Sequence, residues 1–370
     1  MNRANRLWDR AVLQVQRKLG IRDPLRIMPY KGYGTPWQVR IKGRVLEKEG
    51  IRSLSKEAAV LRNLVNMYRR FDSDEVPEAK LKVCIGDCQT TVTANREGFF
   101  TADLTVESPL STTSLWSKVH IELLDPPPRK QSAVTATGEV VLVTPAAQFG
   151  VISDIDDTVV YTAASNPLEM IRIAYLGNAR SRRPFAGVAA FYHALQKGAD
   201  SGSPNPENSS RNPIFYISSS PWNMYDLFDK FMNSNSIPKG PILLRDIELS
   251  PANLMSFSHR EHKREQIDPL LTRFSDLPFI LFGDSGQKDA EIYAQIVKDY
   301  PDRILAVYIR DALPDDDTRH QQIEQIAQQI REAGTEFLLF LETVEAATHA
   351  AEKGWIAKDA IAKVKADLCE

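Results

Sequence analysis

Three carboxylates lie within four residues where an apolar stretch, residues 149–152, leads into Ser153-Asp154-Ile155-Asp156-Asp157-Thr158. Carboxylates packed this closely repel one another, so burial requires a cation or a proton to offset their charge. An all-oxygen set of this kind suits Mg²⁺. On an extended chain Asp154 and Asp156 project to the same side. One of them could therefore act as a nucleophile while the other donates and accepts protons. The alternative is an acidic turn that caps the next helix.

A serine cluster, Ser218-Ser219-Ser220, follows a second apolar stretch at residues 214–217 and precedes Pro221. Hydroxyl groups and free backbone N–H groups at a strand end suit phosphate oxygens. The alternative is a helix N-cap with proline in the first turn.

Two further segments supply a lysine and two more carboxylates. Residues 258–261 fit a capping box, which puts Lys263 near the start of a helix. There Lys263 either neutralises phosphoryl charge or lies on a solvated helix face. A third apolar stretch, residues 279–282, leads to Gly283-Asp284 and on to Asp289. Asp284 is the better candidate metal ligand, whereas Asp289 either joins it or only caps the following helix.

The elements that position these clusters are short apolar strands alternating with helices after residue 149. This alternation predicts an α/β fold, a Rossmann-like parallel sheet with helices on both faces. In such sheets ligands bind outside the carboxyl ends of the strands, where the clusters are expected to meet. The predicted strands cover residues 151–153, 214–217, 242–244, 279–282, 304–309 and 337–341.

The residues before this region have a different periodicity. Between residues 25 and 147 polar and apolar residues alternate, which predicts a small β-sandwich. Residues 5–19 have the spacing of an amphipathic helix with a basic face. We therefore expect an N-terminal amphipathic helix (1–24), a β-sandwich-like domain (25–147), an α/β domain (148–345) and a C-terminal helical tail (346–370).

Composition excludes several classes of protein. Among 370 residues, 46 Lys and Arg against 48 Asp and Glu give a net charge of −2, so no strong nucleic-acid interaction is expected. Three cysteines (Cys84, Cys88 and Cys369) are too few for a disulfide framework or a four-ligand zinc site. No apolar stretch approaches the roughly 20 residues of a transmembrane helix. We expect a cytoplasmic protein, with peripheral membrane contact through the basic helix left open.

The four strand-end clusters together resemble the four motifs of the haloacid dehalogenase superfamily of phosphotransferases. Their amino-acid sequences are similar to those of the catalytic domain of the actin-patch phosphatidate phosphatases and their bacterial relatives. The similar segments are ISDIDDT (152–158), YISSSPWN (216–223), HKREQI (262–267), FGDSGQKDAEIY (282–293) and YIRD (308–311), with GYGTPWQV (32–39) resembling the preceding β-rich region.

The resemblance implies Mg²⁺-dependent hydrolysis of a phosphomonoester through an aspartyl-phosphate on Asp154. Asp156 would protonate the leaving oxygen and then activate water. The implied site consists of catalytic Asp154, Asp156, Ser218 and Lys263, metal-binding Asp154, Asp156, Asp284 and Asp289, and substrate-binding Thr158, Ser219, Arg182 and Arg183. Whether Ser218 or Ser219 binds the phosphoryl group stays open.

Substrate choice depends on what covers the site. The segments between the motifs are too short for a large folded lid, which favours a bulky or membrane-held phosphoester. An apolar helix expected from Asn166 ends in basic residues that include Arg182 and Arg183, where apolar and positive groups could meet lipid. Phosphatidate is the leading substrate. The alternatives are another bulky phosphomonoester, on a phosphoprotein or a nucleic-acid end, and a non-enzymatic scaffold that binds lipid or phosphate.

Overall fold

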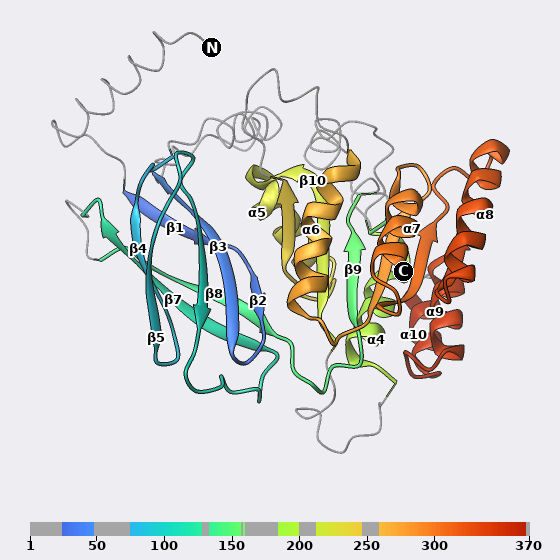
Figure 1. Ribbon diagram of the computed structural model, residues 1–370, viewed down its shortest axis with the longest axis horizontal. Helices are drawn as coiled ribbons and strands as arrows, with labels where there is room; N and C mark the ends of the chain where they lie inside the picture. Colours follow the sequence, from blue (N-terminus) through green and yellow to red (C-terminus); the bar gives the residue numbers. More distant parts are fainter. Residues whose placement is uncertain are drawn as a thin grey trace, which may run out of the picture. The chain divides into compact units, whose positions relative to one another are not determined.

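A computed structural model of the chain describes residues 24–47, 75–127, 133–156, 158–159, 184–199, 212–245 and 259–367 (Figure 1). It divides into two compact units, and in the described chain the main boundary falls between Leu142 and Val143. The predicted N-terminal helix, the apolar helix after Asn166, and Arg182 and Arg183 lie outside the described residues. The proposed boundaries of the four segments stay predictions.

The first unit is built from β-strands. In the part of the chain that is described, these are β1 (Leu25–Pro29), β2 (Gly32–Gly34), β3 (Gln38–Glu47), β4 (Lys80–Ile85), β5 (Cys88–Thr93), β6 (Phe99–Thr105), β7 (Trp116–Asp125) and β8 (Thr135–Leu142). They join in one sheet of order β1-β3-β2-β8-β7-β4-β5, with β6 paired to β3. The expected two-sheet sandwich is therefore not confirmed.

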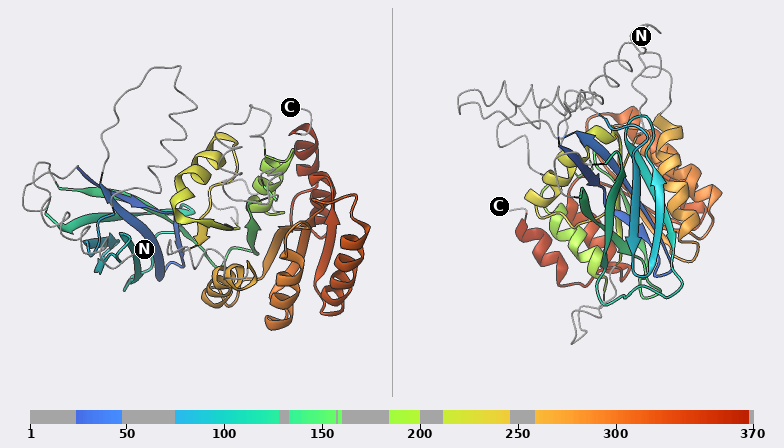
Figure 2. Two further views of the ribbon diagram at one scale, coloured as in Figure 1. Left: turned by 90° about the horizontal axis from the view of Figure 1, so that it is seen from above. Right: turned by 90° about the vertical axis from the view of Figure 1, so that its left-hand side faces the viewer.

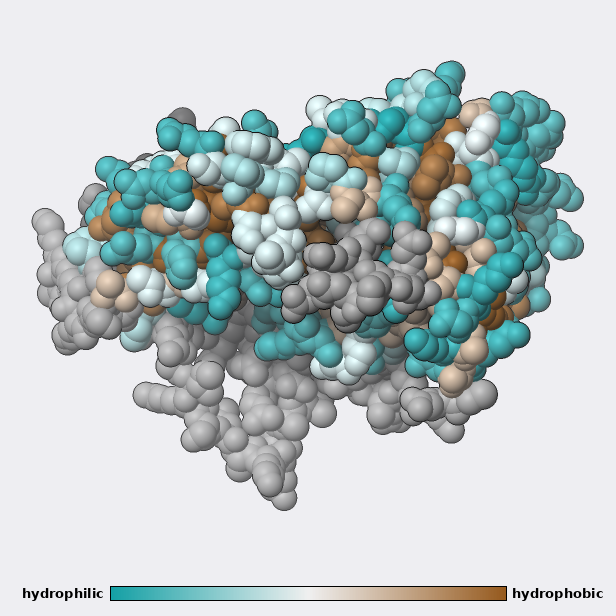
Figure 3. Space-filling model, turned by 90° about the horizontal axis from the view of Figure 1, so that it is seen from below, coloured by the Kyte–Doolittle hydropathy of each residue, from teal (hydrophilic) through white to brown (hydrophobic). Residues whose placement is uncertain are grey.

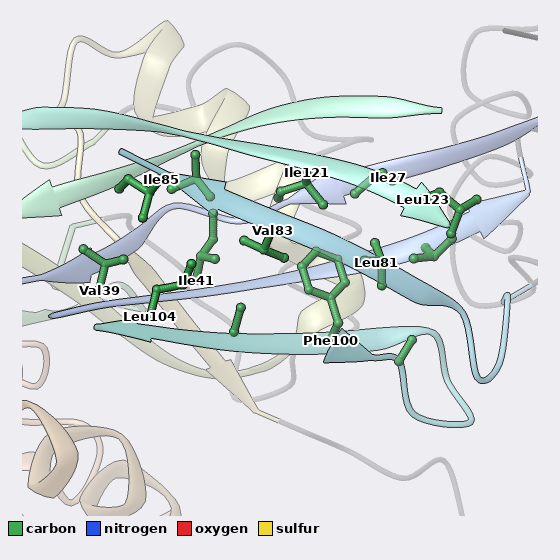
Figure 4. Packing of buried hydrophobic residues seen from close by; sticks show 14 of the residues in the cluster. Ile27, Val39, Ile41, Leu81, Val83, Ile85, Phe100, Leu104, Ile121 and Leu123 are labelled. Atoms are coloured by element: carbon green, nitrogen blue, oxygen red, sulfur yellow. The ribbon is translucent and has the colours of Figure 1, made fainter. Parts of the chain in front are cut away.

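Alternation along these strands builds the core of the first unit. On β4, Leu81, Val83 and Ile85 are buried, whereas the residues that alternate with them, Lys80, Lys82 and Cys84, are exposed or half-buried. Figure 4 shows such buried side chains from several strands, among them Val83 and Phe100, packed together. A period of two thus gives the sheet one apolar face, as expected for a half-buried strand.

The second unit is a parallel sheet covered by helices. Its described strands are β9 (Gly150–Asp154), β10 (Ile214–Pro221), β11 (Ile242–Arg245), β12 (Phe279–Asp284), β13 (Ile304–Arg310) and β14 (Glu336–Phe340), in the order β11-β10-β9-β12-β13-β14. Its described helices are α4 (Val188–Lys197), the 3₁₀ helix η3 (Trp222–Met224), α5 (Tyr225–Ser234), α6 (His259–Arg273), α7 (Asp289–Asp299), α8 (Asp317–Glu332), α9 (Thr343–Glu352) and α10 (Ala360–Asp367). The predicted α/β class with a parallel sheet is confirmed.

Helices lie on both faces of this sheet (Figure 2). Strands β9 and β12 are buried along their whole length, as expected for a parallel sheet covered on both sides. Helix α8 packs only its apolar side, with Ile323, Ala327 and Ile330 buried. Hydrophilic residues accordingly cover much of the face seen in Figure 3. No helix among the described residues is long and apolar enough to cross a membrane.

Strand order defines where a ligand can bind. Strand β9 pairs in parallel with β10 on one side and with β12 on the other. The chain runs from β9 through β10 to β11 on one side and then crosses to β12, β13 and β14 on the other side of β9. The crevice at the carboxyl end of β9 is therefore the topological switch point of the sheet. Asp154, the serine cluster 218–220 and Asp284 lie in the last residues of β9, β10 and β12 at this end, and β10 extends past the predicted strand end at residue 217 to Pro221.

Arg303, just before β13, holds the end of helix α6. Its Nη2 lies 3.2, 2.7 and 3.0 Å from the carbonyl oxygens of Leu271, Phe274 and Leu277, in the last turn of α6 and the loop after it. Carbonyls at a helix end have no partner within the helix, so a cation there stabilises them. Burial lowers the pKa of Arg303 from its ordinary value.

Replacing Arg303 with methionine should lower the free energy of unfolding by about 2 kcal/mol, because buried carbonyls lose a charged donor. Urea denaturation followed by circular dichroism measures this. Arg331→Met on α8 is the control, since Arg331 forms an exposed pair with Glu324 worth less than about 1 kcal/mol. Equal losses in the two variants would contradict the anchoring role of Arg303.

Candidate active site

Three carboxylates from separate segments meet at the switch point. Asp154 ends β9, Asp284 ends β12 and Asp289 begins α7. All three side chains are fully buried, and one oxygen from each lies within 4.8 Å of the others. Asp284 N donates to Asp289 Oδ2 over 3.2 Å, which fixes the two residues relative to each other. The structure therefore brings together the acidic residues that the sequence placed on different strands.

A glycine is required where the chain enters this cluster. A Cβ atom added to Gly283 would lie 2.5 Å from Asp289 Oδ2 and 2.6 Å from Asp289 Cβ. Any other residue at this position would displace Asp289. The glycine before Asp284 is thus explained by close packing against a site residue.

Lys263 projects from α6 into the acidic cluster and is 1% exposed. Its Nζ lies 2.9 Å from Asp154 Oδ1 and also contacts Asp289 Oδ1. Burial alone would lower the pKa of Lys263, but Asp154, Asp289 and Asp284 outweigh it and raise the pKa above its ordinary value. The ammonium group is therefore charged, and the predicted inward placement of Lys263 is observed.

The cluster still carries excess negative charge. Burial raises the pKa of Asp154 well above its ordinary value, and the neighbouring carboxylates add to this effect against the opposing charge of Lys263. Asp154 Oδ2 is buried and accepts no hydrogen bond from the described residues. A divalent cation bound by carboxylate oxygens would offset this charge. Asp154, Asp284 and Asp289 are the residues that fit such an ion.

Asp156 and Ser218 contact each other beside the cluster. Ser218 Oγ donates to Asp156 Oδ2 over 2.8 Å and accepts from Ser220 N over 3.1 Å. Ser219 Oγ is buried and has no hydrogen-bond partner among the described residues, and the same holds for Thr158 Oγ1. Ser218, one of the two serines left open as the phosphoryl-binding residue, is thus engaged with Asp156. Ser219 and Thr158 offer hydroxyl groups that no described residue engages.

Sequence reasoning missed Gln266, one helical turn after Lys263. Gln266 Nε2 donates to Ser218 O over 3.2 Å and to Leu243 O over 3.0 Å, which joins α6 to β10 and β11. The spacing of three between Lys263 and Gln266 puts both on one side of the helix. That spacing was a usable signal, although it could not identify the two carbonyls.

Arg310, at the end of β13, was also missed as a site residue. Its Nε donates to Thr158 O over 3.3 Å, and its guanidinium lies 3.9 Å from the centre of the Phe185 ring. Burial lowers the pKa of Arg310 to about 10. The arginine therefore stays charged at neutral pH and holds the chain just after the acidic motif.

The switch point of this α/β fold holds carboxylates, a buried lysine and serine hydroxyls. Such a site is suited to bind a cation and a phosphoryl group. Residues 149–311 match the family model described as "Phosphatidate phosphatase APP1, catalytic domain". The resemblance indicated by the motifs is therefore confirmed for this region.

Two curated fungal proteins are similar to the chain. Phosphatidate phosphatase APP1 of Saccharomyces cerevisiae is 31% identical over 200 residues, which cover 54% of this chain and 32% of the yeast protein. An uncharacterized protein of Schizosaccharomyces pombe is 25% identical over 226 residues, covering 60% of this chain and 35% of that protein. The chain therefore spans about a third of the length of these relatives.

Similarity to solved structures is low. A carbohydrate acetylesterase from Xanthomonas citri aligns over 84% of this chain and 66% of its own, with 11% identity and a TM-score of 0.29. A TM-score of this size does not indicate a shared fold.

MgCl₂ added to metal-free protein should raise the thermal unfolding midpoint, because a bound cation offsets the buried carboxylates. A ligand at 100 times its dissociation constant stabilises the folded state by about 2.7 kcal/mol. Differential scanning fluorimetry of chelator-treated protein measures the shift. Asp284→Asn should lose most of it, whereas Glu324→Gln on the exposed side of α8 should retain it. An undiminished shift in Asp284→Asn would exclude Asp284 as a ligand.

Proposed function

We propose that this protein is a Mg²⁺-dependent phosphatase that hydrolyses a phosphomonoester through an aspartyl-phosphate on Asp154. The contact of buried Asp154 with Lys263 inside the acidic cluster carries the proposal. The match of residues 149–311 to a phosphatidate phosphatase catalytic domain supports it independently.

Asp154 is the proposed nucleophile. One of its carboxylate oxygens bonds to phosphorus as the ester oxygen leaves, and Asp156 gives its proton to that leaving oxygen. Water then attacks phosphorus and gives a proton back to Asp156. The bond between phosphorus and the Asp154 oxygen breaks in this step, so inorganic phosphate leaves and the Asp154 carboxylate is restored. The hydrogen bond from Ser218 Oγ to Asp156 Oδ2 supports this role, because it fixes the orientation of the acid.

Charge on the phosphoryl group is balanced by groups of the same site. Lys263 Nζ, held by Asp154 and Asp289, lies where it can bind a phosphoryl oxygen beside the nucleophile. Asp154, Asp284 and Asp289, with the Asp156 carbonyl implied by the family resemblance, would hold Mg²⁺. The ion supplies charge neutralisation for the phosphoryl oxygens.

Ser219 and Thr158 are the proposed donors to the remaining phosphoryl oxygens. Their hydroxyl groups are buried and unpartnered among the described residues, so a phosphate oxygen would satisfy them. Arg182 and Arg183 stay proposed substrate contacts on sequence grounds alone.

Phosphatidate is the proposed substrate, with diacylglycerol as the product. The name of the matched catalytic domain and that of the yeast relative support this choice. Such a substrate would bring the protein from the cytoplasm to a membrane surface. Other bulky phosphomonoesters are the alternatives that a substrate panel would separate.

Asp154→Asn should abolish phosphate release, because the amide oxygen is a poor nucleophile and the covalent intermediate cannot form. We expect a loss of at least about 10⁴-fold in kcat, the scale seen when a nucleophile is removed. Malachite green detection of phosphate from para-nitrophenyl phosphate and phosphatidate measures it. Asp226→Asn on α5, a partly exposed carboxylate in an ion pair with Lys230, is the matched control. Full turnover by Asp154→Asn would refute the nucleophile.

Phosphatidate in mixed micelles should be hydrolysed with a higher kcat/KM than phosphopeptides, nucleotides and sugar phosphates. The physical reason is that, by their length in the sequence, the segments between the motifs are too short to form a large folded lid around a small substrate. Phosphate release is measured for each substrate, with Asp154→Asn as the blank. Activity confined to small sugar phosphates would overturn the lipid assignment and leave the phosphatase assignment standing.

A further inference from the structure

We propose that Arg319, on helix α8, is a positioning residue that holds the loop between β12 and α7 in the conformation presenting Asp284 to a divalent cation. The inference rests on the proposed metal-dependent function. It concerns a residue that lies outside the matched catalytic region, which ends at residue 311.

Arg319 donates directly to the backbone of this loop. Its Nε lies 2.7 Å from Ser285 O, and its Nη2 lies 2.7 Å from Gln287 O. The side chain is only 12% exposed, so these two hydrogen bonds are largely shielded from water. One guanidinium group therefore fixes two carbonyls on either side of Gly286.

The loop transmits this restraint to the carboxylate. Gln287 N donates to Asp284 Oδ1 over 2.8 Å, while the carbonyl of the same residue is held by Arg319. A Cβ atom at Gly286 would lie 3.2 Å from Asp284 Oδ1, so the loop backbone packs closely against the carboxylate. Arg319 thus acts on Asp284 through a single intervening residue.

The guanidinium is itself held in place. Glu291, in the first turn of α7, accepts from Arg319 Nη1 over 2.6 Å and from Nη2 over 3.1 Å. A two-point ion pair of this kind fixes the plane of the guanidinium. Because α7 begins at Asp289, the same pair also ties Arg319 to the helix that carries another carboxylate of the cluster.

A second contact from the first turns of α8 reaches the other side of the loop. His320 Nε2 lies 2.8 Å from Asp311 Oδ2, and Asp311 Oδ1 accepts from Ser285 Oγ over 3.1 Å. Consecutive residues of α8 therefore hold Ser285, the neighbour of Asp284, by its carbonyl and by its hydroxyl. The first turns of α8 form the anchor of the loop.

The charge of Arg319 and its positioning role predict opposite effects on the affinity of the site for a cation. As a positive charge near the acidic cluster, Arg319 by itself disfavours a bound cation. As a positioning residue it favours the cation, because it prepares the ligand geometry. Removing the side chain therefore tightens metal binding in the first case and weakens it in the second.

Isothermal titration calorimetry of the chelator-treated full chain with MgCl₂ separates these cases. Loss of a partner that orients a metal ligand typically weakens metal affinity by about 10–100-fold, and we expect a loss in this range for R319M. R319K keeps the charge but cannot hold both carbonyls and Glu291 together, so its affinity should also fall. R331M, on the same helix in an exposed pair with Glu324, should bind as the wild type does.

The outcomes separate this inference from the proposed function. Wild-type protein that binds no Mg²⁺ overturns both. Wild-type binding with equal or tighter binding by R319K and R319M overturns the positioning role alone. Weaker binding by R319K, measured at a temperature where circular dichroism reports a native spectrum, supports the role even where R319M does not fold.

Discussion

Burying several carboxylates in one place is the constraint on which the second unit depends. Asp154, Asp284 and Asp289 are fully buried and close enough to share one ion, and like charges at this distance repel strongly in a medium of low polarity. Lys263 offsets part of the charge through its contacts with Asp154 and Asp289. Burial, together with the neighbouring carboxylates, raises the pKa of Asp154 against the charge of Lys263. A divalent cation bound here would offset the remaining negative charge and could also neutralise a phosphoryl group.

Such a site is stable only if its surroundings fix it. Gln266 joins the lysine-bearing helix to β10 and β11, Arg303 holds the far end of that helix, and Arg310 holds the chain at Thr158. These groups donate to backbone carbonyls rather than to site carboxylates. They therefore restrain the position of the acidic groups without neutralising them, so the negative charge stays available for a metal and the nucleophile.

The match to a known catalytic domain covers part of the chain. The match to a phosphatidate phosphatase catalytic domain covers residues 149–311, a region that begins at β9 and ends just after β13. The sheet of the first unit precedes it, and α8 to α10 follow it. Arg319 extends the site beyond the matched region, since α8 contacts the loop that carries Asp284.

The sequence by itself determined the class of the second unit and the identity of its acidic groups. Buried parallel strands need continuous apolar stretches, and the first polar residues after such a stretch mark the carboxyl end of the strand, so the places of Asp154, Ser218 and Asp284 were predictable. Tertiary structure alone decided that Ser218 binds Asp156, that Gln266 reaches β10 and that Arg319 holds the Asp284 loop. These contacts join segments far apart in the chain, and they depend on how each helix docks on the sheet, which no local spacing encodes.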